Sequence, residues 1–231
     1  MKNILSILFF FCTIQTYAQS DKDKGFSGSL NLGVTMPVLN YESDAVYTGQ
    51  NYGVGVYYQF LHNLFAGLDI FVHGSNNEMF SSDGSEMKAI YSGFLLGLGI
   101  EFNKNNFFLS QEIKAGYLTG RSEPFNEFTP YTFGFGSINF EHGKASGFAG
   151  GYKIIPGYNF NNYFSVGLYG QFLDSNLKWK IPFNSYFSGS PPDYTSSKVD
   201  GIDIFEEKYM TVSAGIVITF YFVSNKHVEA N

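Results

Sequence analysis

Apolar residues alternate with mostly small or hydroxylated residues from Met210 to Phe222. Successive side chains of a β-strand point to opposite faces, so this pattern predicts a strand with one apolar face. The same two-residue period recurs along the chain and helical periodicity is weak throughout, which predicts an all-β fold of eight strands. The predicted strands cover residues 27–36, 51–60, 64–73, 89–102, 107–118, 147–160, 163–172 and 210–222.

The connections between these strands alternate between short and long. Short ones lie around His62, Lys104 and Asn161, and long ones cover residues 37–50, 74–88, 119–146 and 174–207. An up-and-down antiparallel barrel collects its short turns at one end and its long loops at the other, an arrangement typical of barrels that span membranes.

Two segments leave alternatives open. Residues 119–146 contain Tyr131, Phe133 and Phe135 in alternation, so this segment either extends its neighbouring strands or adds strands to make a ten-stranded barrel. Pro156 lies inside the predicted strand 147–160 and has no N–H to donate to a strand ladder, so a β-bulge is predicted there.

Composition indicates where the apolar faces go. Charged residues make up only 15% of the chain and aromatic residues 19%, whereas soluble domains carry roughly 25% charged residues. No stretch after residue 19 approaches the roughly 20 apolar residues that a membrane helix needs. Backbone polar groups in hydrocarbon must be paired within the protein, so we predict a closed antiparallel up-and-down transmembrane β-barrel.

A soluble barrel that carries an apolar ligand is the alternative, and it would turn the apolar faces inward. The second face of the strands favours the membrane barrel, because it carries few charges for a surface in water and many glycines that suit a narrow lumen. Its polar residues are Asn31, Thr35, Gln59, Asp69, Glu101, Glu112, Lys114, Lys153 and Gln171. The apolar faces end near the short turns in aromatic residues that predict a periplasmic interfacial girdle, namely Phe60, Phe102, Phe107, Phe160, Phe164 and Phe222.

Four of the polar residues share one level of the predicted lumen. Asp69, Glu112, Lys114 and Lys153 lie at similar distances from their short turns and on the same face of their strands. Two acids and two bases inside a narrow barrel are expected to pair, because an isolated buried charge is costly. We therefore predict a network that plugs the lumen. The alternative is four independent residues solvated by trapped water.

Residues 1–18 are predicted to be a signal peptide. Lys2 precedes an apolar run from Ile4 to Ile14, and Ala18 is a small residue suited to cleavage. The mature chain is then expected to comprise a periplasmic segment at 19–26, the barrel at 27–222 and a periplasmic tail at 223–231.

Cleavage would also change the chemistry available to the chain. Cys12 is the only cysteine, so the mature protein would have no disulfide bond, thiol nucleophile or cysteine metal site. Loss of Lys2 would leave 13 basic and 20 acidic residues and a net charge of −7. The sequence shows no basic patch that suggests a nucleic-acid partner.

No catalytic, cofactor-binding or metal-binding set is recognisable in the sequence. The four histidines, His62, His73, His142 and His227, show no ligand spacing, so a non-enzymatic protein is expected, with a lipid-modifying barrel enzyme as the alternative. The predicted loop 174–207 is the main candidate for binding a surface ligand or a protein. It contains Trp179, Tyr186, Phe187, Pro191, Pro192, Tyr194 and the acidic residues Asp200, Asp203, Glu206 and Glu207.

Three segments together resemble a known family. They are the cleavage region Tyr17-Ala18-Gln19, the stretch from Gly157 to Val166 (GYNFNNYFSV), and the closing strand that ends in Phe220-Tyr221-Phe222. The chain resembles the small outer-membrane β-barrel proteins of the Bacteroidetes type, which share the barrel architecture of OmpA and OmpX. The resemblance implies an outer-membrane location, contact with outer-membrane lipid, and a terminal aromatic residue read by the outer-membrane assembly machinery. The chain departs from that pattern in one respect, because Val223 to Asn231 follow the aromatic residue.

Overall fold

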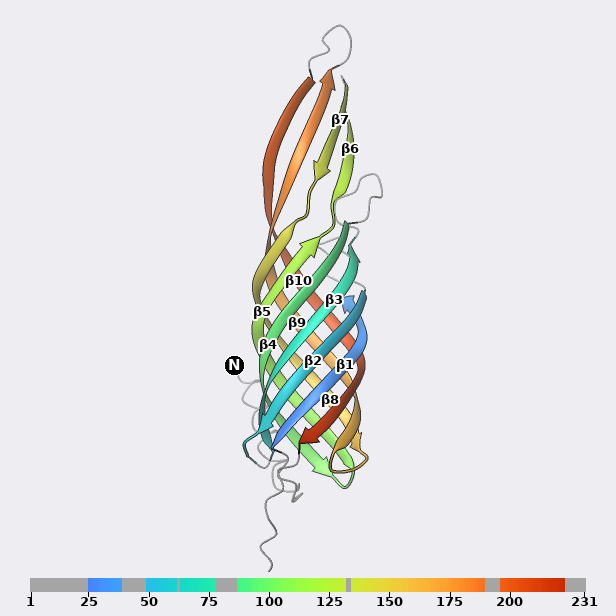
Figure 1. Ribbon diagram of the computed structural model, residues 1–231, viewed down its shortest axis with the longest axis vertical. Helices are drawn as coiled ribbons and strands as arrows, with labels where there is room; N and C mark the ends of the chain where they lie inside the picture. Colours follow the sequence, from blue (N-terminus) through green and yellow to red (C-terminus); the bar gives the residue numbers. More distant parts are fainter. Residues whose placement is uncertain are drawn as a thin grey trace, which may run out of the picture.

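The computed structural model describes residues 25–38, 49–61, 63–77, 87–131, 134–189 and 196–222. Ten strands form one antiparallel sheet, and eight of them close into a ring in the order β1, β2, β3, β4, β5, β8, β9, β10 (Figure 1). The ring strands are β1 (Phe26–Pro37), β2 (Gly49–Gln59), β3 (Leu64–Asn77), β4 (Met87–Lys104), β5 (Phe107–Ser122), β8 (Lys144–Asn159), β9 (Phe164–Gly189) and β10 (Ser196–Phe222). The predicted closed barrel of eight strands is confirmed. No helix in the described ranges is long and apolar enough to span a membrane.

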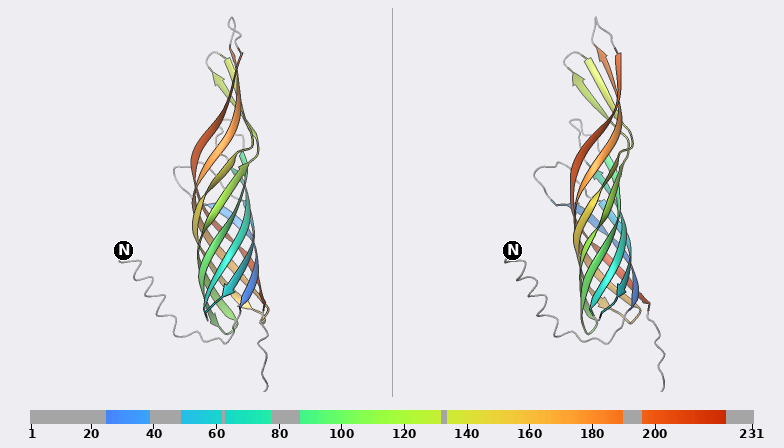
Figure 2. Two further views of the ribbon diagram at one scale, coloured as in Figure 1. Left: turned by 60° about the vertical axis from the view of Figure 1, so that its left-hand side comes forward. Right: turned by 90° about the vertical axis from the view of Figure 1, so that its left-hand side faces the viewer.

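The pairing register gives the barrel a pronounced stagger. Paired positions followed once round the ring from Met36 return to β1 at Phe26, ten residues away. Such a stagger requires strands that are strongly tilted from the barrel axis, as Figure 2 shows. An eight-stranded barrel has an interior just wide enough to be filled by side chains.

The short connections lie together at one end of the barrel, beside the start of β1 and the end of β10 (Figure 1). The turn between β4 and β5 illustrates why the chain reverses at the predicted short connections. Lys104 pairs with Phe107, and Asn105 between them has a φ of 56°. Asparagine tolerates this left-handed backbone better than most residues.

The opposite end differs from the predicted loops. β9 and β10 continue far beyond the last β8–β9 pair, Lys144–Lys180, and remain paired from Ile181–Asp203 up to Ser188–Ser196. A hairpin of β6 (Phe125–Tyr131) and β7 (Gly134–Phe140) joins them, because β7 pairs with the upper part of β9. We call these four paired segments the projecting sheet (Figures 1 and 2).

The prediction that residues 119–146 and 174–207 are loops is therefore wrong, because most of both segments is paired in strands. Residues 174–181 still alternate between polar and apolar, so the backbone continues as a strand, but the apolar residues have moved to the other face. The ten-stranded barrel is also wrong, because β6 and β7 pair beyond the ring and do not enter it.

The predicted bulge at Pro156 is wrong as well. Pairing between β8 and β9 is interrupted at Pro156, but Ile154–Gly170 and Gly157–Gly167 are three residues apart on both strands. No residue is inserted, so alternation continues through the proline, with Ile155 inward and Pro156 outward. The missing N–H is accommodated by a local gap in the ladder.

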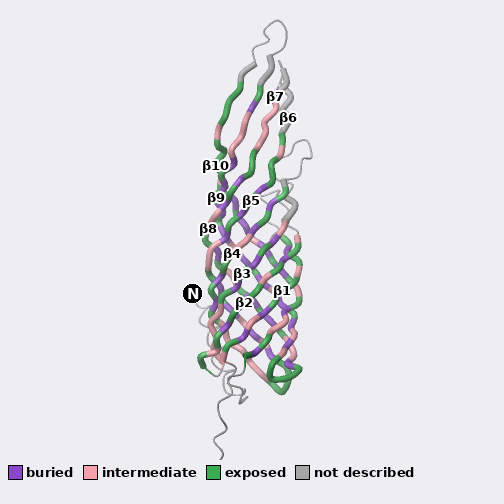
Figure 3. Tube along the Cα trace, viewed as in Figure 1, coloured by how far each residue is buried: buried purple, intermediate pink, exposed green. Residues whose placement is uncertain are grey.

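The alternating apolar faces cover the outside of the ring. Leu96, Leu98 and Ile113 are 62%, 66% and 70% exposed, while the side chains between them, such as Leu95 and Glu112, are buried (Figure 3). The inward-facing arrangement of a soluble carrier barrel is therefore wrong for this chain.

Candidate functional site

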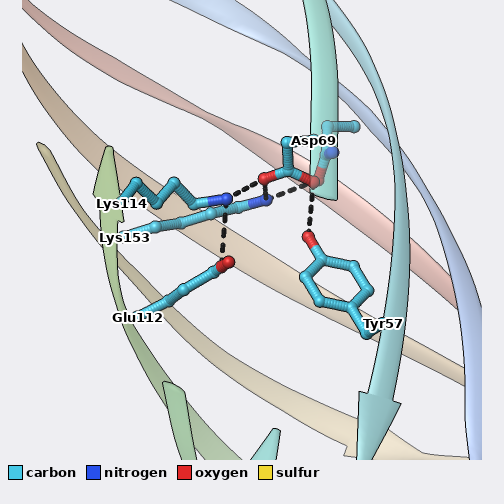
Figure 4. A network of polar contacts seen from close by, with 6 residues as sticks. Tyr57, Asp69, Glu112, Lys114 and Lys153 are labelled. Carbon is cyan, nitrogen blue, oxygen red and sulfur yellow. Dashed lines mark hydrogen bonds and ion pairs between the residues drawn. The ribbon is translucent and has the colours of Figure 1, made fainter. Parts of the chain in front are cut away.

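The four charged residues predicted for the lumen lie together inside the barrel, on three strands. Asp69 comes from β3, Glu112 and Lys114 come from β5, and Lys153 comes from β8 (Figure 4). Lys114 Nζ contacts Asp69 Oδ2 and lies 3.0 Å from Glu112 Oε2. Lys153 Nζ lies 3.4 Å from the same Asp69 oxygen. We call these four residues the lumen network.

Neutral side chains complete the coordination of the network. Tyr57 on β2 donates its hydroxyl to Asp69 Oδ1 at 2.6 Å, and Lys153 donates to Asn31 Oδ1 at 3.1 Å. Lys153 Nζ also lies 5.5 Å from the centroid of the Tyr169 ring. Sequence reasoning missed Tyr57 and Tyr169 as partners. Their positions on the inward face of their strands were the available signal.

Two glycines make room for these long side chains. A Cβ at Gly97, on the inward face of β4, would overlap the Glu112 carboxylate. A Cβ at Gly55, on β2, would overlap Asp69 Oδ1. The lumen is narrow, so a charged side chain that crosses it needs a neighbour without a side chain.

The lumen network is electrically balanced, with two acids and two bases. All four residues are at most 4% exposed, so water contributes little to their solvation. Burial of a charge is costly unless a partner and hydrogen bonds compensate it. Asp69 is well compensated, whereas Glu112 has the ion contact with Lys114 but accepts no hydrogen bond in the described part of the protein.

An apolar and aromatic cluster fills the lumen on the side of the long connections. We call it the upper core. It comprises Phe71, Ala89, Tyr91, Leu95, Leu118, Ala145, Ala149, Leu173, Leu177, Trp179, Ile181 and Tyr209. Sequence reasoning predicted a polar lumen and missed this cluster. The signal was in β9, where Leu173, Leu177, Trp179 and Ile181 recur on one face.

Two polar pairs are embedded in the upper core. Trp179 donates its indole N–H to Glu207 Oε2 at 2.5 Å. His73 Nδ1 and the Tyr209 hydroxyl are hydrogen-bonded at 2.8 Å, and the His73 ring stacks on Tyr91 with centroids 5.8 Å apart. Along β10, Glu207 lies outside the segment from Met210 to Phe222 whose outward side chains are apolar. Burial raises the pKa of its carboxyl to about 8.

Towards the short turns, a second buried cluster of Phe108, Ile155, Tyr169 and Val217 narrows the lumen. A cavity of about 50 Å³ lies at this end, lined by residues that include Tyr57, Phe65, Glu112 and Tyr221. It has room for a few water molecules only. Side chains therefore fill the lumen in three layers: this cluster, the lumen network and the upper core.

The predicted aromatic girdle lies on the outside at the short-turn end. Phe60, Phe107, Phe160 and Phe222 are exposed, and Phe102 and Phe164 are half-buried. Ring contacts link several neighbours, for example Phe160 and Phe164 with centroids 5.5 Å apart.

The residues predicted for a surface site in 174–207 lie on opposite faces of β9 and β10, so some are buried and others are exposed. Trp179 and Glu207 are buried and unavailable to a ligand, while Tyr186 is 48% exposed. Asp200, Asp203 and Glu206 are also exposed. Several predicted features lie outside the described residues. They are Pro191, Pro192, Tyr194, the side chain of Phe187, His62, His227, the predicted signal peptide and the predicted tail.

Comparisons with solved structures return β-barrels from bacterial outer membranes. Outer membrane protein OprG from Pseudomonas aeruginosa is 16% identical, with a TM-score of 0.45 over 87% of this chain and 98% of that protein. The attachment invasion locus protein Ail of Yersinia pestis is 10% identical, with a TM-score of 0.43 over 86% and 98%. The outer membrane protease OmpT from Escherichia coli is 10% identical, with a TM-score of 0.40 over 90% and 100%.

These identities and TM-scores are low, so the assignment of the fold depends on the strand pairing of this chain itself. No protein-family model matches the chain, and no curated protein is detectably similar to it in sequence.

Proposed function

We propose that the protein is an integral outer-membrane β-barrel without enzymatic activity. Its lumen is closed by side chains, and the projecting sheet serves a structural or interaction role at the cell surface. The proposal is supported by the outer surface of the ring, the filled lumen and the asymmetry of the two ends.

The observation that carries this proposal is a reversal of polarity along β9. From Phe164 to Phe172 the outward positions are apolar or glycine and the inward ones include Ser165 and Gln171. From Asp174 to Lys180 the outward positions are polar or charged, and Leu177 and Trp179 point inward. A strand in water buries its apolar side chains inside, whereas a strand in lipid turns them outward. The medium around β9 therefore changes next to Asp174.

On β10 the outward residues also change from apolar to charged, for two positions, before the outward Ile204 and Ile202. The outward residues from Met210 to Phe222 are apolar, and the next two outward positions are Lys208 and Glu206. Thirteen strand residues at the tilt of an eight-stranded barrel span roughly 30 Å, which matches the hydrocarbon core of a bilayer. We call this outer surface the apolar band.

The asymmetry of the two ends supports an orientation. Outer-membrane barrels place short turns in the periplasm and longer segments outside. The projecting sheet would then stand at the cell surface, and the turn at Lys104 would face the periplasm.

Extraction and gel mobility test the membrane location. The protein should require detergent for extraction, and it should migrate differently on gels before and after heating, because closed barrels often resist unfolding by detergent. Release by a salt or carbonate wash without detergent would contradict the proposal.

Labelling with a membrane-impermeant maleimide tests the orientation. The variants Asp203→Cys and Lys104→Cys place a single new thiol on the projecting sheet and at a short turn. Intact cells should label D203C but not K104C, and lysed cells should label both. The reverse result in intact cells would invert the orientation.

A further inference from the structure

Three basic residues form a row across adjacent strands on the outside of the barrel. Arg121 on β5 pairs directly with Lys144 on β8, and Lys144 pairs directly with Lys180 on β9. All three side chains are exposed. We call these residues the cationic row.

Arg121 and Lys144 stand at the upper border of the apolar band, and Lys180 stands beyond that border on β9. Towards the short turns, the second outward position is aromatic on two of its strands, Tyr117 on β5 and Phe148 on β8, with Thr119 and Ser146 between. On β9 the polar residues Asp174, Asn176 and Lys178 separate Lys180 from the outward Phe172. Phe148 is 83% exposed, which makes it the most exposed large apolar side chain in the described ranges. Lys88, Lys178 and Lys208 lie along the same border on β4, β9 and β10 and are also exposed.

Among the described residues, no acid lies directly opposite a base of this row. Within the described residues, none of the three bases forms an ion pair. The acids beside it include Glu123, two residues beyond Arg121 in sequence, and Glu206, which pairs directly with Lys178. Like charges directly opposite each other on neighbouring strands destabilise a sheet. An external anion would relieve that repulsion.

We propose that the cationic row binds the phosphate groups of phosphorylated lipids in the surrounding membrane leaflet. This inference depends on the proposed membrane location. A lipid is the ligand that fits, because its phosphate would meet the cations while its acyl chains lie against Tyr117 and Phe148, further towards the short turns. Neighbouring strands are about 4.8 Å apart, so the two ends of the row are about 10 Å apart. That span suits a head group with two phosphates.

The test uses protein reconstituted in phosphatidylcholine bilayers that contain a minor fraction of diphosphorylated lipid A, with monophosphorylated lipid A as the comparison. Native mass spectrometry measures how much of each lipid remains bound. The test variant K144Q/K180Q removes two charges of the row. The matched control K104Q/K198Q also removes two exposed lysines, one at a short turn and one on the projecting sheet.

The wild type and the control should retain diphosphorylated lipid A in preference to the monophosphorylated form. K144Q/K180Q should bind it roughly 30-fold more weakly, because a basic residue near an anionic membrane surface contributes about a fivefold factor in binding. Retention by the wild type should also fall as salt rises.

Three results would overturn the lipid site. Equal retention by K144Q/K180Q and the control would do so, provided that both keep heat-dependent gel mobility, and the membrane proposal would then stand. Equal displacement of the lipid by millimolar inorganic phosphate and by soluble diphosphorylated glucosamine disaccharide would assign the row to free phosphate. Failure of the wild type to enter bilayers would remove both proposals.

Discussion

Lys114 is the residue on which the lumen network depends most, because it contacts both acids. Its side chain is fully buried beside Asp69 and Glu112. Loss of one member of a buried charge network leaves the others uncompensated, which costs more than a surface ion pair gains.

Replacement of Lys114 by alanine should therefore lower the free energy of unfolding by roughly 3–5 kcal/mol. Urea unfolding of the reconstituted barrel measures this change. Lys104→Ala, at an exposed turn, is the control and should change stability by no more than about 0.5 kcal/mol. Equal stability of the two variants would contradict the network.

A double-mutant cycle separates a network from independent solvated residues. Asp69→Asn and Lys114→Met together should cost less than the sum of the two single changes, with a coupling of about 0.5–3 kcal/mol. Additive effects would support the alternative in which each residue is solvated by trapped water.

Glu207 makes the stability of the upper core depend on pH. Its pKa is raised from an ordinary value of 4.5 to about 8 in the folded protein. Between these values the unfolded chain releases a proton that the folded chain retains, so stability falls as pH rises from about 4.5 to about 8. Below this window the carboxyl is protonated in both states and makes no difference, and above it the full loss is present.

Glu207→Gln should remove that decline and still accept the hydrogen bond from Trp179. The emission of Trp179, the only tryptophan in the chain, reports unfolding of this region at each pH. Glu206→Gln, exposed on the opposite face, serves as the control. If E207Q loses stability between pH 5 and pH 8 as steeply as E206Q, Glu207 is not the titrating group.

At the scale of the strand, β9 and β10 each change the type of residue on their outward face, at Asp174 and at Lys208. The outward side chains Ile216 and Ile204 both belong to β10 and are 48% and 55% exposed. Only Ile216 lies in the apolar band, since Lys208 and Glu206 separate the two positions. Their similar exposure makes them a matched pair for locating the lipid.

Arginine substitutions should separate these positions. Leu96→Arg and Ile216→Arg should each cost roughly 2–4 kcal/mol, because they place a charge near the middle of the bilayer. Ile204→Arg should cost less than about 1 kcal/mol, because its surroundings are aqueous. Unfolding in lipid vesicles measures all three. Equal costs at Ile216 and Ile204 would place both positions in the same medium.

At the scale of the whole molecule, three layers of side chains occupy the lumen. The upper core is largely apolar, and so is the cluster of Phe108, Ile155, Tyr169 and Val217 towards the short turns. The lumen network lies between them. An ion would have to displace packed aromatic rings such as Tyr91 and Tyr209, whose centroids are 4.8 Å apart.

The wild-type protein should therefore show no steady conductance in planar bilayers. Lys114→Ala should remain closed as well, because the upper core does not depend on the charge. A large steady conductance of the wild type would mean that the layers open in lipid and that the lumen is a channel.

The sequence by itself determined the closed eight-stranded barrel, the outward direction of the apolar faces and the set of lumen charges. These features depend on a two-residue period and on composition, and both are local or additive properties of the chain. Asp69, Glu112, Lys114 and Lys153 could be placed at one level because strand geometry converts residue counts into height.

Only the tertiary structure decided the features that depend on pairing between distant segments. The register brings Tyr57 to Asp69, stacks the upper core, and aligns Arg121, Lys144 and Lys180 in one row. The projecting sheet could not be predicted because the apolar residues of β9 change to the other face near Asp174, where one continuous apolar face ends. The pairing of β7 with β9 could not be predicted either, because nothing local in residues 134–140 specifies a partner about 50 residues away.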